Sequence, residues 1–181
     1  MLTPYRWAGL TVAIGLLAAC SARYADHIIG DPVNVVLSDA RNERVGLARI
    51  TQTDTGVRIV VGARRLSPGR HGFLIHQVGR CEPPDFASAG PHFDPAGKQH
   101  GHLNPAGAHA GDLPNLIADL NGDAQLDITL QELKLYDGPT PLVSDSGAAL
   151  VLHADPDDEM TDPSGNSGPR IACGVILAPG R

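Results

Sequence analysis

Aromatic residues and lysines are scarce in this sequence. Phe, Trp and Tyr make up 4% of the 181 residues, and the lysines are Lys98 and Lys134. The formal net charge is -6 at pH 7, so the chain lacks the basic surface on which nucleic-acid binding depends. We therefore expect no nucleic acid among its partners. With so few aromatic rings, the core must be built from Val, Ile, Leu and Ala.

The sequence also gives little sign of long helices. It contains 21 glycines and 15 prolines, which favour turns and disfavour helix interiors. Its length suits a single domain with a substantial core. Short β-branched segments between turn residues predict strands at 34–38, 45–53, 57–63, 70–77, 116–119, 124–130, 148–153 and 171–178. The pair Asn121-Gly122 between two apolar segments predicts a hairpin. Eight short strands at this spacing predict an all-β sandwich or barrel.

The N-terminus has the features of a targeting segment. Arg6 precedes an apolar segment, 7–19, that is too short to span a bilayer comfortably. The segment ends in Leu17-Ala18-Ala19-Cys20, which resembles a bacterial lipobox, so that cleavage would leave Cys20 as a lipid-modified N-terminus. The alternative is an ordinary secretion signal in which this cysteine is incidental.

The lipobox interpretation predicts the domain organisation and the location. We expect a signal peptide at 1–19, a tether at 20–31 and one folded domain at 32–181. The protein would then be held in the cell envelope, facing the periplasm, through a membrane anchor at Cys20. Ser21 follows that cysteine where an aspartate would favour the inner membrane, so we expect the outer membrane.

Two cysteines, Cys81 and Cys173, lie beyond the predicted lipidation site. In an exported domain, such a pair favours one disulfide bond. The two residues are 92 positions apart, so the bond would close half of the chain. In the chain-entropy model a loop of this size contributes about 4–5 kcal/mol to stability.

Most of the histidines gather in one loop-like segment between His71 and Asp112. From His92, the next candidate ligands follow after eight, nine and three positions, at His100, His109 and Asp112. Imidazoles and a carboxylate form a ligand set for zinc or copper. A solvated histidine-rich loop is the alternative, but a loop this long needs a reason to be ordered.

Five motifs in order resemble the copper/zinc superoxide dismutase family, over about residues 32–179. They are PGRHGFLIH (68–76), AGPHFDP (89–95), HAGDLPN (109–115), LVLH (150–153) and GNSGPRIACGVI (165–176). The resemblance implies an eight-stranded Greek-key β-barrel, an immunoglobulin-like sandwich, with a long zinc loop and a second active-site loop. It also implies a Cys81–Cys173 bond that ties the first loop to the last strand.

The resemblance further implies a complete zinc site, whose ligands are His92, His100, His109 and Asp112. It implies that His92 bridges zinc to copper through its two ring nitrogens. A carboxylate linking the two sites matches Asp157, with Asp158 as the alternative if the alignment slips by one. His71 matches a hydrogen-bonded histidine behind the ligands.

The copper site is where the sequence departs from the family. The family has His-x-His on the strand, and the corresponding residues here are Leu74 and His76. The remaining copper ligands would be His76, His92 and His153. Because strand side chains alternate between faces, 74 and 76 share a face and His71 lies on the other. Leucine cannot coordinate a metal, so we expect weak Cu(II) binding and slow turnover or none.

Two residues matched by the resemblance carry the catalytic roles. Arg170 would attract superoxide to the copper, and His92 would take up and deliver a proton. The acidic loop 154–168 contains no lysine, so Arg170 is the basic residue of this region that could attract an anion. The loop's carboxylates have a simpler interpretation as a solvated surface.

Three functions follow from these features. The first is an envelope superoxide dismutase, impaired by Leu74, with superoxide as its substrate and zinc and copper as cofactors. The second is a non-catalytic member that keeps structural zinc and buffers or hands over copper. The third is a scaffold in which zinc only stabilises the fold. A homodimer is compatible with each of them.

Overall fold

The structure is a computed structural model that describes residues 27–177. The predicted signal peptide and Cys20 lie outside this part of the chain. Nine strands are present in the described part: β1 (Val33–Asp39), β2 (Arg44–Gln52), β3 (Val57–Ala63), β4 (Gly69–His71), β5 (Phe73–His76), β6 (Leu116–Ala118), β7 (Ala124–Leu130), β8 (Ala148–His153) and β9 (Arg170–Ile176). One short 3-10 helix covers Ala87–Ala89.

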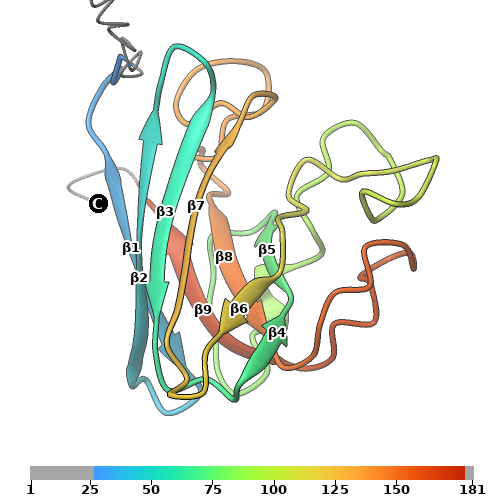
Figure 1. Cartoon of the computed structure of the whole chain (residues 1–181). Coiled ribbons are helices and arrows are strands. Elements are labelled where there is room, and N and C mark those ends of the chain that lie inside the picture. The colour runs from blue at the N-terminus through green and yellow to red at the C-terminus, as the bar shows by residue number, and fades with distance from the viewer. Residues whose placement is uncertain (1–26, 178–181) are drawn as a thin grey trace, which may run out of the picture.

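The strands form one antiparallel sheet in the order β4-β6-β7-β3-β2-β1-β9-β8-β5. Its two end strands, β4 and β5, are consecutive in the chain, so the sheet curls until its ends meet (Figure 1). The result is a nearly closed barrel, which confirms the predicted all-β barrel. Two long loops, 77–115 and 154–169, extend from the side of the barrel away from β2 and β3.

The number of strands differs from the sequence prediction at one place. The single strand expected at 70–77 is divided at Gly72 into β4 and β5. The Gly72 N–H donates to the Asp155 carbonyl, and the Gly72 carbonyl accepts from the His153 N–H, at 2.9 and 2.8 Å. A Cβ atom at Gly72 would lie 2.8 Å from Cβ of Ser167. The second loop therefore packs onto the chain here, and the strand is interrupted.

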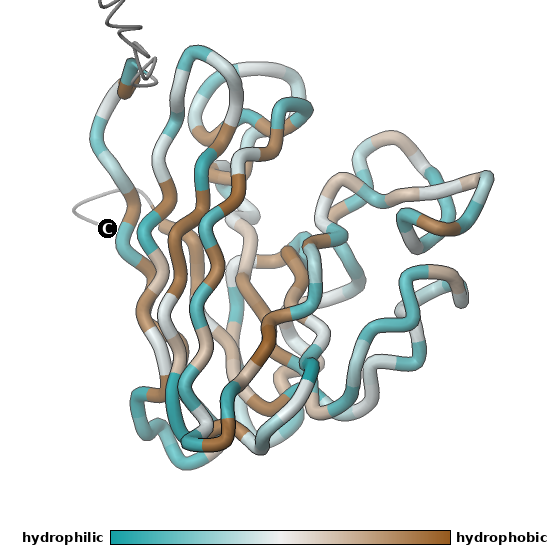
Figure 2. The backbone as a smooth tube through the Cα atoms, in the orientation of Figure 1, coloured by the Kyte–Doolittle hydropathy of each residue, from teal (hydrophilic) through white to brown (hydrophobic). Residues whose placement is uncertain are grey.

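The barrel interior is aliphatic, as the composition predicts. Along β3, buried and exposed residues alternate, so that Val57, Ile59 and Val61 face the core. Figure 2 shows the hydrophobic positions concentrated along the strands, with mostly hydrophilic residues in the long loops. By contrast, every residue of β5 and of β8 is buried. Both faces of these two strands are covered, one by the core and the other by the long loops.

Loop 77–115 is fastened to the barrel by the Cys81–Cys173 disulfide, which confirms the predicted pairing. Cys173 lies in β9, and it packs with Phe86, Ala89 and Val151 in a second apolar cluster outside the main core. The chain that precedes the barrel is also attached, because the Ile29 N–H donates to the Gln52 carbonyl at 2.8 Å. Among the described residues, no helix is long and apolar enough to cross a membrane.

Candidate metal centre

The candidate site lies against the outer face of β5 and β8. Phe73 and Ile75 of β5 belong to the main core, so Leu74 and His76 point to the opposite face. Leu74 pairs with Val151 of β8, and His76 pairs with Ala149. The loop that carries His92 runs along the edge of β5 that does not pair with β8, since His76 and His92 form an isolated β-bridge and the Phe93 N–H donates to the Ile75 carbonyl at 2.8 Å.

One cluster of ligand-type side chains contains all four residues of the predicted zinc set. The Nδ1 atoms of His92, His100 and His109 lie 3.1, 3.0 and 3.2 Å from a single oxygen, Oδ1 of Asp112. The four candidate ligand atoms lie within 4.8 Å of one another. A tetrahedral zinc with bonds near 2.05 Å has ligand–ligand edges of roughly 3.3 Å. The donor types and their spacing therefore fit one metal ion.

The orientation of Asp112 is fixed by the backbone. Its Oδ2 atom accepts hydrogen bonds from the N–H groups of Gly101 and His109, at 2.9 and 3.0 Å. Burial raises the pKa of this carboxyl, but the hydrogen bonds with His100 and His92 hold the pKa well below its usual range. Asp112 is thus ionised and aimed at the three imidazoles.

His100 is held between two carboxylates. Its Nδ1 atom faces Asp112, and its Nε2 atom lies 2.8 Å from Oδ1 of Asp157. Burial lowers the pKa of His100, but the hydrogen bonds with Asp112 and Asp157 outweigh it and raise the pKa to about 9. The structure thus places Asp157 against the first cluster. Asp158 instead accepts hydrogen bonds from Thr161 within its own loop.

A second cluster contains His76, His92 and His153, the residues predicted for copper. The Nδ1 atoms of His76 and His153 lie 2.8 and 3.0 Å from the carbonyls of Gly90 and Gly168. Each ring donates its Nδ1–H there, which leaves a lone pair on Nε2. The two Nε2 atoms lie 3.4 Å apart. Two facing lone pairs repel unless a cation lies near both, so this cluster also fits a metal ion.

These two imidazoles are neutral at physiological pH. Burial lowers the pKa of His76 to about 2 and that of His153 to about 4, although the hydrogen bonds to Gly90 and Gly168 act in the opposite direction. The charges of His92 and Arg170 lower both values further. A metal ion would therefore find His76 and His153 without a proton to displace.

His92 belongs to both clusters. Its Nδ1 atom lies 3.1 Å from Asp112, and its Nε2 atom is buried and has no hydrogen-bond partner. The His92 ring makes edge contacts with His76 and His153, at centroid separations of 4.9 and 6.4 Å. A buried nitrogen without a partner is costly, and a second metal ion would satisfy it.

Leu74 is fully buried beside these histidines. It forms an isolated β-bridge with Asp112, and it belongs to neither apolar cluster. It offers no donor atom on the face that also carries His76. His71, on the other side of the Gly72 break, packs behind the site, with ring nitrogens 2.9 Å from the His153 carbonyl and 2.8 Å from the Ser67 carbonyl.

Arg170 lies next to the second cluster and is held rigidly. Its guanidinium donates to the carbonyls of Phe86 and Gly90, at 2.6 and 2.7 Å. Gly90 therefore accepts from both Arg170 and His76. Burial lowers the pKa of Arg170, but its guanidinium still carries its charge at neutral pH. A fixed cation beside the second cluster can attract a small anion.

Two contacts of the site were not assigned from the sequence. Asn115 exchanges two hydrogen bonds with the backbone of Asp157, at 2.8 and 2.9 Å, and so joins the two loops. The Ser167 hydroxyl lies 3.0 Å from Nδ1 of His153. Both residues stand within the motifs that carry the resemblance, which is the signal that could have identified them.

The acidic loop is more organised than a solvated surface. Asp158 accepts from the Met160 and Thr161 N–H groups, and Asp162 accepts from the His100 N–H at 2.7 Å. Glu159 forms an ion pair with Arg70 at 3.4 Å. These carboxylates stiffen the loop over the histidines, and they add no attraction for an anion.

Comparison with known proteins agrees with this geometry. Residues 44–176 match the family model described as copper/zinc superoxide dismutase (SODC). The Cu-Zn superoxide dismutase 1 of Aquifex aeolicus is 45% identical over 138 residues, which cover 75% of this chain and 82% of that protein. Superoxide dismutase-like protein YojM of Bacillus subtilis is 40% identical over 147 residues, which cover 80% of this chain and 75% of that protein.

Solved structures show the same fold. The crystal structure of a SOD-like protein from Bacillus subtilis has a TM-score of 0.77 and 39% identity, and covers 80% of this chain and 97% of that chain. The Cu/Zn superoxide dismutase from Brucella abortus has a TM-score of 0.65 and 30% identity, and covers 81% of this chain and 99% of that chain.

Proposed function

The chain belongs to the copper/zinc superoxide dismutase family, and we propose that it binds zinc at its first cluster and copper at its second. The zinc ligands are His92, His100, His109 and Asp112. The copper ligands are His76, His92 and His153. We propose that the copper-loaded protein converts superoxide to oxygen and hydrogen peroxide, at a rate limited by the absent fourth imidazole.

The observation that carries this proposal is the position of His92. One of its nitrogens faces the oxygen of Asp112, and the other is buried without a partner near His76 and His153. An imidazole in this position could offer one ring nitrogen to each of two metal ions. Neither cluster alone would explain why both nitrogens of this ring are kept from water.

Bound copper would supply one-electron redox chemistry, accepting an electron from one superoxide and returning it to another. The protein's own residues supply the remainder. His76 and His153 present Nε2 because carbonyl oxygens hold their Nδ1–H groups. Arg170 provides the positive charge that draws the anion toward the second cluster. Nε2 of His92 is an atom that can hold one of the two protons needed to form hydrogen peroxide, and solvent supplies the other.

The expected rate of dismutation depends on the incomplete set of copper ligands. Cu(II) prefers four ligands in a tetragonal arrangement, whereas Cu(I) accepts two or three imidazoles. Leu74 removes one nitrogen from the face on which His76 lies, so the site favours the reduced ion. Copper held by His76, His92 and His153 alone would therefore supply its redox chemistry slowly.

The buried Leu74 also favours a second candidate function. A site with three histidines that prefers Cu(I) can hold copper and release it to another protein without catalysing dismutation. In that case zinc stabilises the loop that carries His92. The two candidates make the same ligand assignments and differ only in whether superoxide is consumed.

One experiment separates the two candidates. Protein loaded with zinc alone is compared with protein loaded with both metals, in a superoxide-consumption assay with metal content measured in each sample. Dismutation requires that copper raise the rate above that of the zinc-only protein and that His153→Ala abolish the gain. His27→Ala changes an exposed histidine outside both clusters and serves as the control. Bound copper without any gain in rate supports the copper-holding candidate.

We also propose that the protein is lipid-anchored at Cys20 in the cell envelope. The lipobox-like sequence before Cys20 supports this proposal. The export that it requires also agrees with the disulfide between Cys81 and Cys173, because such bonds persist in oxidising compartments.

A further inference from the structure

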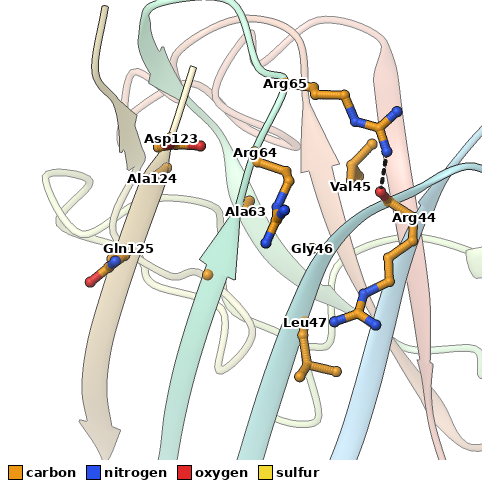
Figure 3. A pocket seen from close by; sticks show the side chains of 11 residues that line it. Arg44, Val45, Gly46, Leu47, Ala63, Arg64, Arg65, Asp123, Ala124 and Gln125 are labelled. Carbon is orange, nitrogen blue, oxygen red and sulfur yellow. Dashed lines mark hydrogen bonds between the residues drawn. The ribbon is translucent and has the colours of Figure 1, made fainter. Parts of the chain in front are cut away.

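A groove of about 920 Å³ lies on the outer face of β2, β3 and β7, away from the long loops that carry the metal ligands (Figures 1 and 3). A second hollow of about 480 Å³ adjoins it and shares Leu47, Gly62 and Gln125 with it. The groove therefore runs along the strands rather than forming a single round pocket. None of the proposed metal ligands lines either hollow.

Gly62 lines both hollows of this face. It lies in the middle of the sheet, paired with Leu47 on β2 and with Gln125 on β7, and it is exposed. A Cβ atom at Gly62 would meet nothing within 4 Å, and its φ is not in the left-handed region. Neither packing nor backbone conformation therefore requires glycine here. Glycine in a strand interior weakens the strand, and it often marks a place where another chain or ligand approaches closely.

The groove carries more positive than negative charge. Asp123 is the one carboxylate that lines the larger hollow, and Asp127 of the smaller hollow is paired with Arg58. Among the described residues, no hydrogen bond or ion pair uses the guanidinium of Arg44, Arg49 or Arg64. Figure 3 shows Arg44, at the start of β2, and Arg64, directly after the end of β3, extending over the groove on either side of Gly46. Other arginines of this face are paired, as with Arg58 and Asp127 or Arg65 and Glu43. Three unpaired guanidiniums stand out on a protein of net charge -6.

Apolar side chains lie on the same face: Leu47 and Val60 line the hollows, and Val36 is paired with Leu47. Val36, Leu47 and Val60 have exposed fractions of 47%, 39% and 40%. Val36 pairs with Leu47, and Leu47 pairs with Gly62. Val36, Leu47 and Gly62 therefore form one row across β1, β2 and β3. A ligand that fits this face must therefore carry both negative charge and apolar surface.

We propose that this groove docks an extended acidic segment of a partner protein. An apolar side chain of the segment sits in the hollow over Gly62, and carboxylates on either side reach Arg44 and Arg64. Guanidinium groups bind carboxylates through two parallel hydrogen bonds, which orients the segment. Two connected hollows hold several residues, which exceeds the size of a single oxyanion. The site does not depend on zinc or copper, because it lies on another face of the barrel.

The test uses the full chain and three labelled peptides, followed by fluorescence anisotropy. EEELEEE supplies charge and an apolar side chain, EEEGEEE lacks the apolar side chain, and KKKLKKK reverses the charge. We expect saturable binding of EEELEEE that weakens with salt, weaker binding of EEEGEEE and none of KKKLKKK. Absence of saturable EEELEEE binding at low salt would overturn the proposal.

Variants locate the binding site. Gly62→Val fills the hollow with a residue that favours strands, and Arg44→Gln with Arg64→Gln removes the unpaired charges. We expect each to weaken EEELEEE binding about tenfold or more, since both act at the centre of the contact. Arg41→Gln is the matched control, because Arg41 is exposed, paired with Asp39 and Glu43, and does not line the groove. Unchanged affinity in both groove variants, with melting temperatures close to wild type, would overturn the proposal.

Two other ligands are tested in the same assay. Complete competition by millimolar inorganic phosphate would indicate a small-anion site and overturn the peptide assignment. So would displacement of the peptide by vesicles that contain an anionic phospholipid, which would indicate a membrane surface. Phosphate that competes only as well as chloride at equal ionic strength supports the acidic segment.

Discussion

His92 and Asp112 meet through one ring nitrogen and one carboxylate oxygen, Nδ1 and Oδ1, which are 3.1 Å apart. This contact commits one side of the His92 ring to the first cluster. The opposite nitrogen is then left buried and unpaired toward His76 and His153. Occupation of the first cluster should therefore fix the ring orientation on which the second cluster depends.

Zinc removal should lower the melting temperature of the protein. A metal that binds only the folded state stabilises it by about 4 kcal/mol at a free concentration 1,000 times its Kd. For a domain of this size, that corresponds to roughly 8–16 °C. Asp112→Ala should abolish the effect of added zinc, and His27→Ala should leave it intact. Calorimetry of metal-free and zinc-loaded samples checks this, and identical melting curves would contradict the zinc assignment.

Zinc binding should expel about one proton from His100 near pH 7.5. The pKa of His100 is raised from 6.5 to about 9, so this imidazole is protonated in the metal-free protein at neutral pH. Its contribution to metal-free stability is complete below pH 6.5 and is lost as the pH rises through about 9. A zinc ligand must be neutral, so binding below pH 9 displaces that proton.

Calorimetric titrations in two buffers with different ionisation enthalpies measure this proton. The number released through His100 should fall toward zero above about pH 10. Asp157→Asn removes one of the two carboxylates that raise the pKa, so its proton release should fall at a lower pH than in wild type. Release that does not change with pH between 7 and 10 would show that His100 is not the source.

The Cys81–Cys173 bond should contribute about 4–5 kcal/mol to the free energy of unfolding, because it closes a loop of 92 positions. Urea unfolding of the double variant Cys81→Ala, Cys173→Ala against the oxidised wild type measures this difference. Mass spectrometry of unreduced protein should show these two peptides linked and Cys20 outside the pair. A double variant as stable as the wild type would contradict the prediction.

Much of the barrel could be predicted because its determinants are local. Asn121-Gly122 is a hairpin signal by itself, and β7 and β8 have the bounds that their apolar segments indicate. The interruption at Gly72 could not be predicted in this way. It depends on Ser167 and Asp155, which come from a loop far away in the chain.

The metal site, too, could be predicted from the sequence only in part. Spacing and the family resemblance identified the histidines of both clusters, which the structure brings together. The ring orientations depend on backbone carbonyls, such as those of Gly90 and Gly168, and residue type does not predict carbonyl positions. The hollow at Gly62 could not be predicted from the sequence either, because it arises from the register of three strands.

Lipidation should make the mature protein fractionate with membranes. Cys20→Ser removes the residue that would carry the acyl chains, and the variant should move to the soluble fraction or keep its signal peptide uncleaved. Mass spectrometry of the N-terminal peptide checks the modification directly. A variant that is processed at the same bond and is just as membrane-bound would exclude the lipobox interpretation.

Leu74→His should increase Cu(II) affinity and the rate of dismutation. Leu74 is fully buried, shares its strand face with His76 and bridges to Asp112, so an imidazole there would face the second cluster. The two side chains have similar volumes, and the metal-free variant should lose about 1–3 kcal/mol for a buried polar group without a partner. Copper should recover that loss, because the fourth nitrogen supplies the tetragonal set that Cu(II) prefers.

Wild type, Leu74→His and Leu74→Asn are compared after identical loading with zinc and copper. The asparagine variant introduces a polar group without an imidazole, so it should gain neither affinity nor rate. Cu(II) retention is measured by competition with a chelator, and the coordination is measured by electron paramagnetic resonance. A wild type that already turns over at the rate of Leu74→His would mean that another ligand fills the position. If copper is retained in full and neither protein is active, the loss lies beyond this ligand, and the acidic loop that covers the histidines becomes the next element to change.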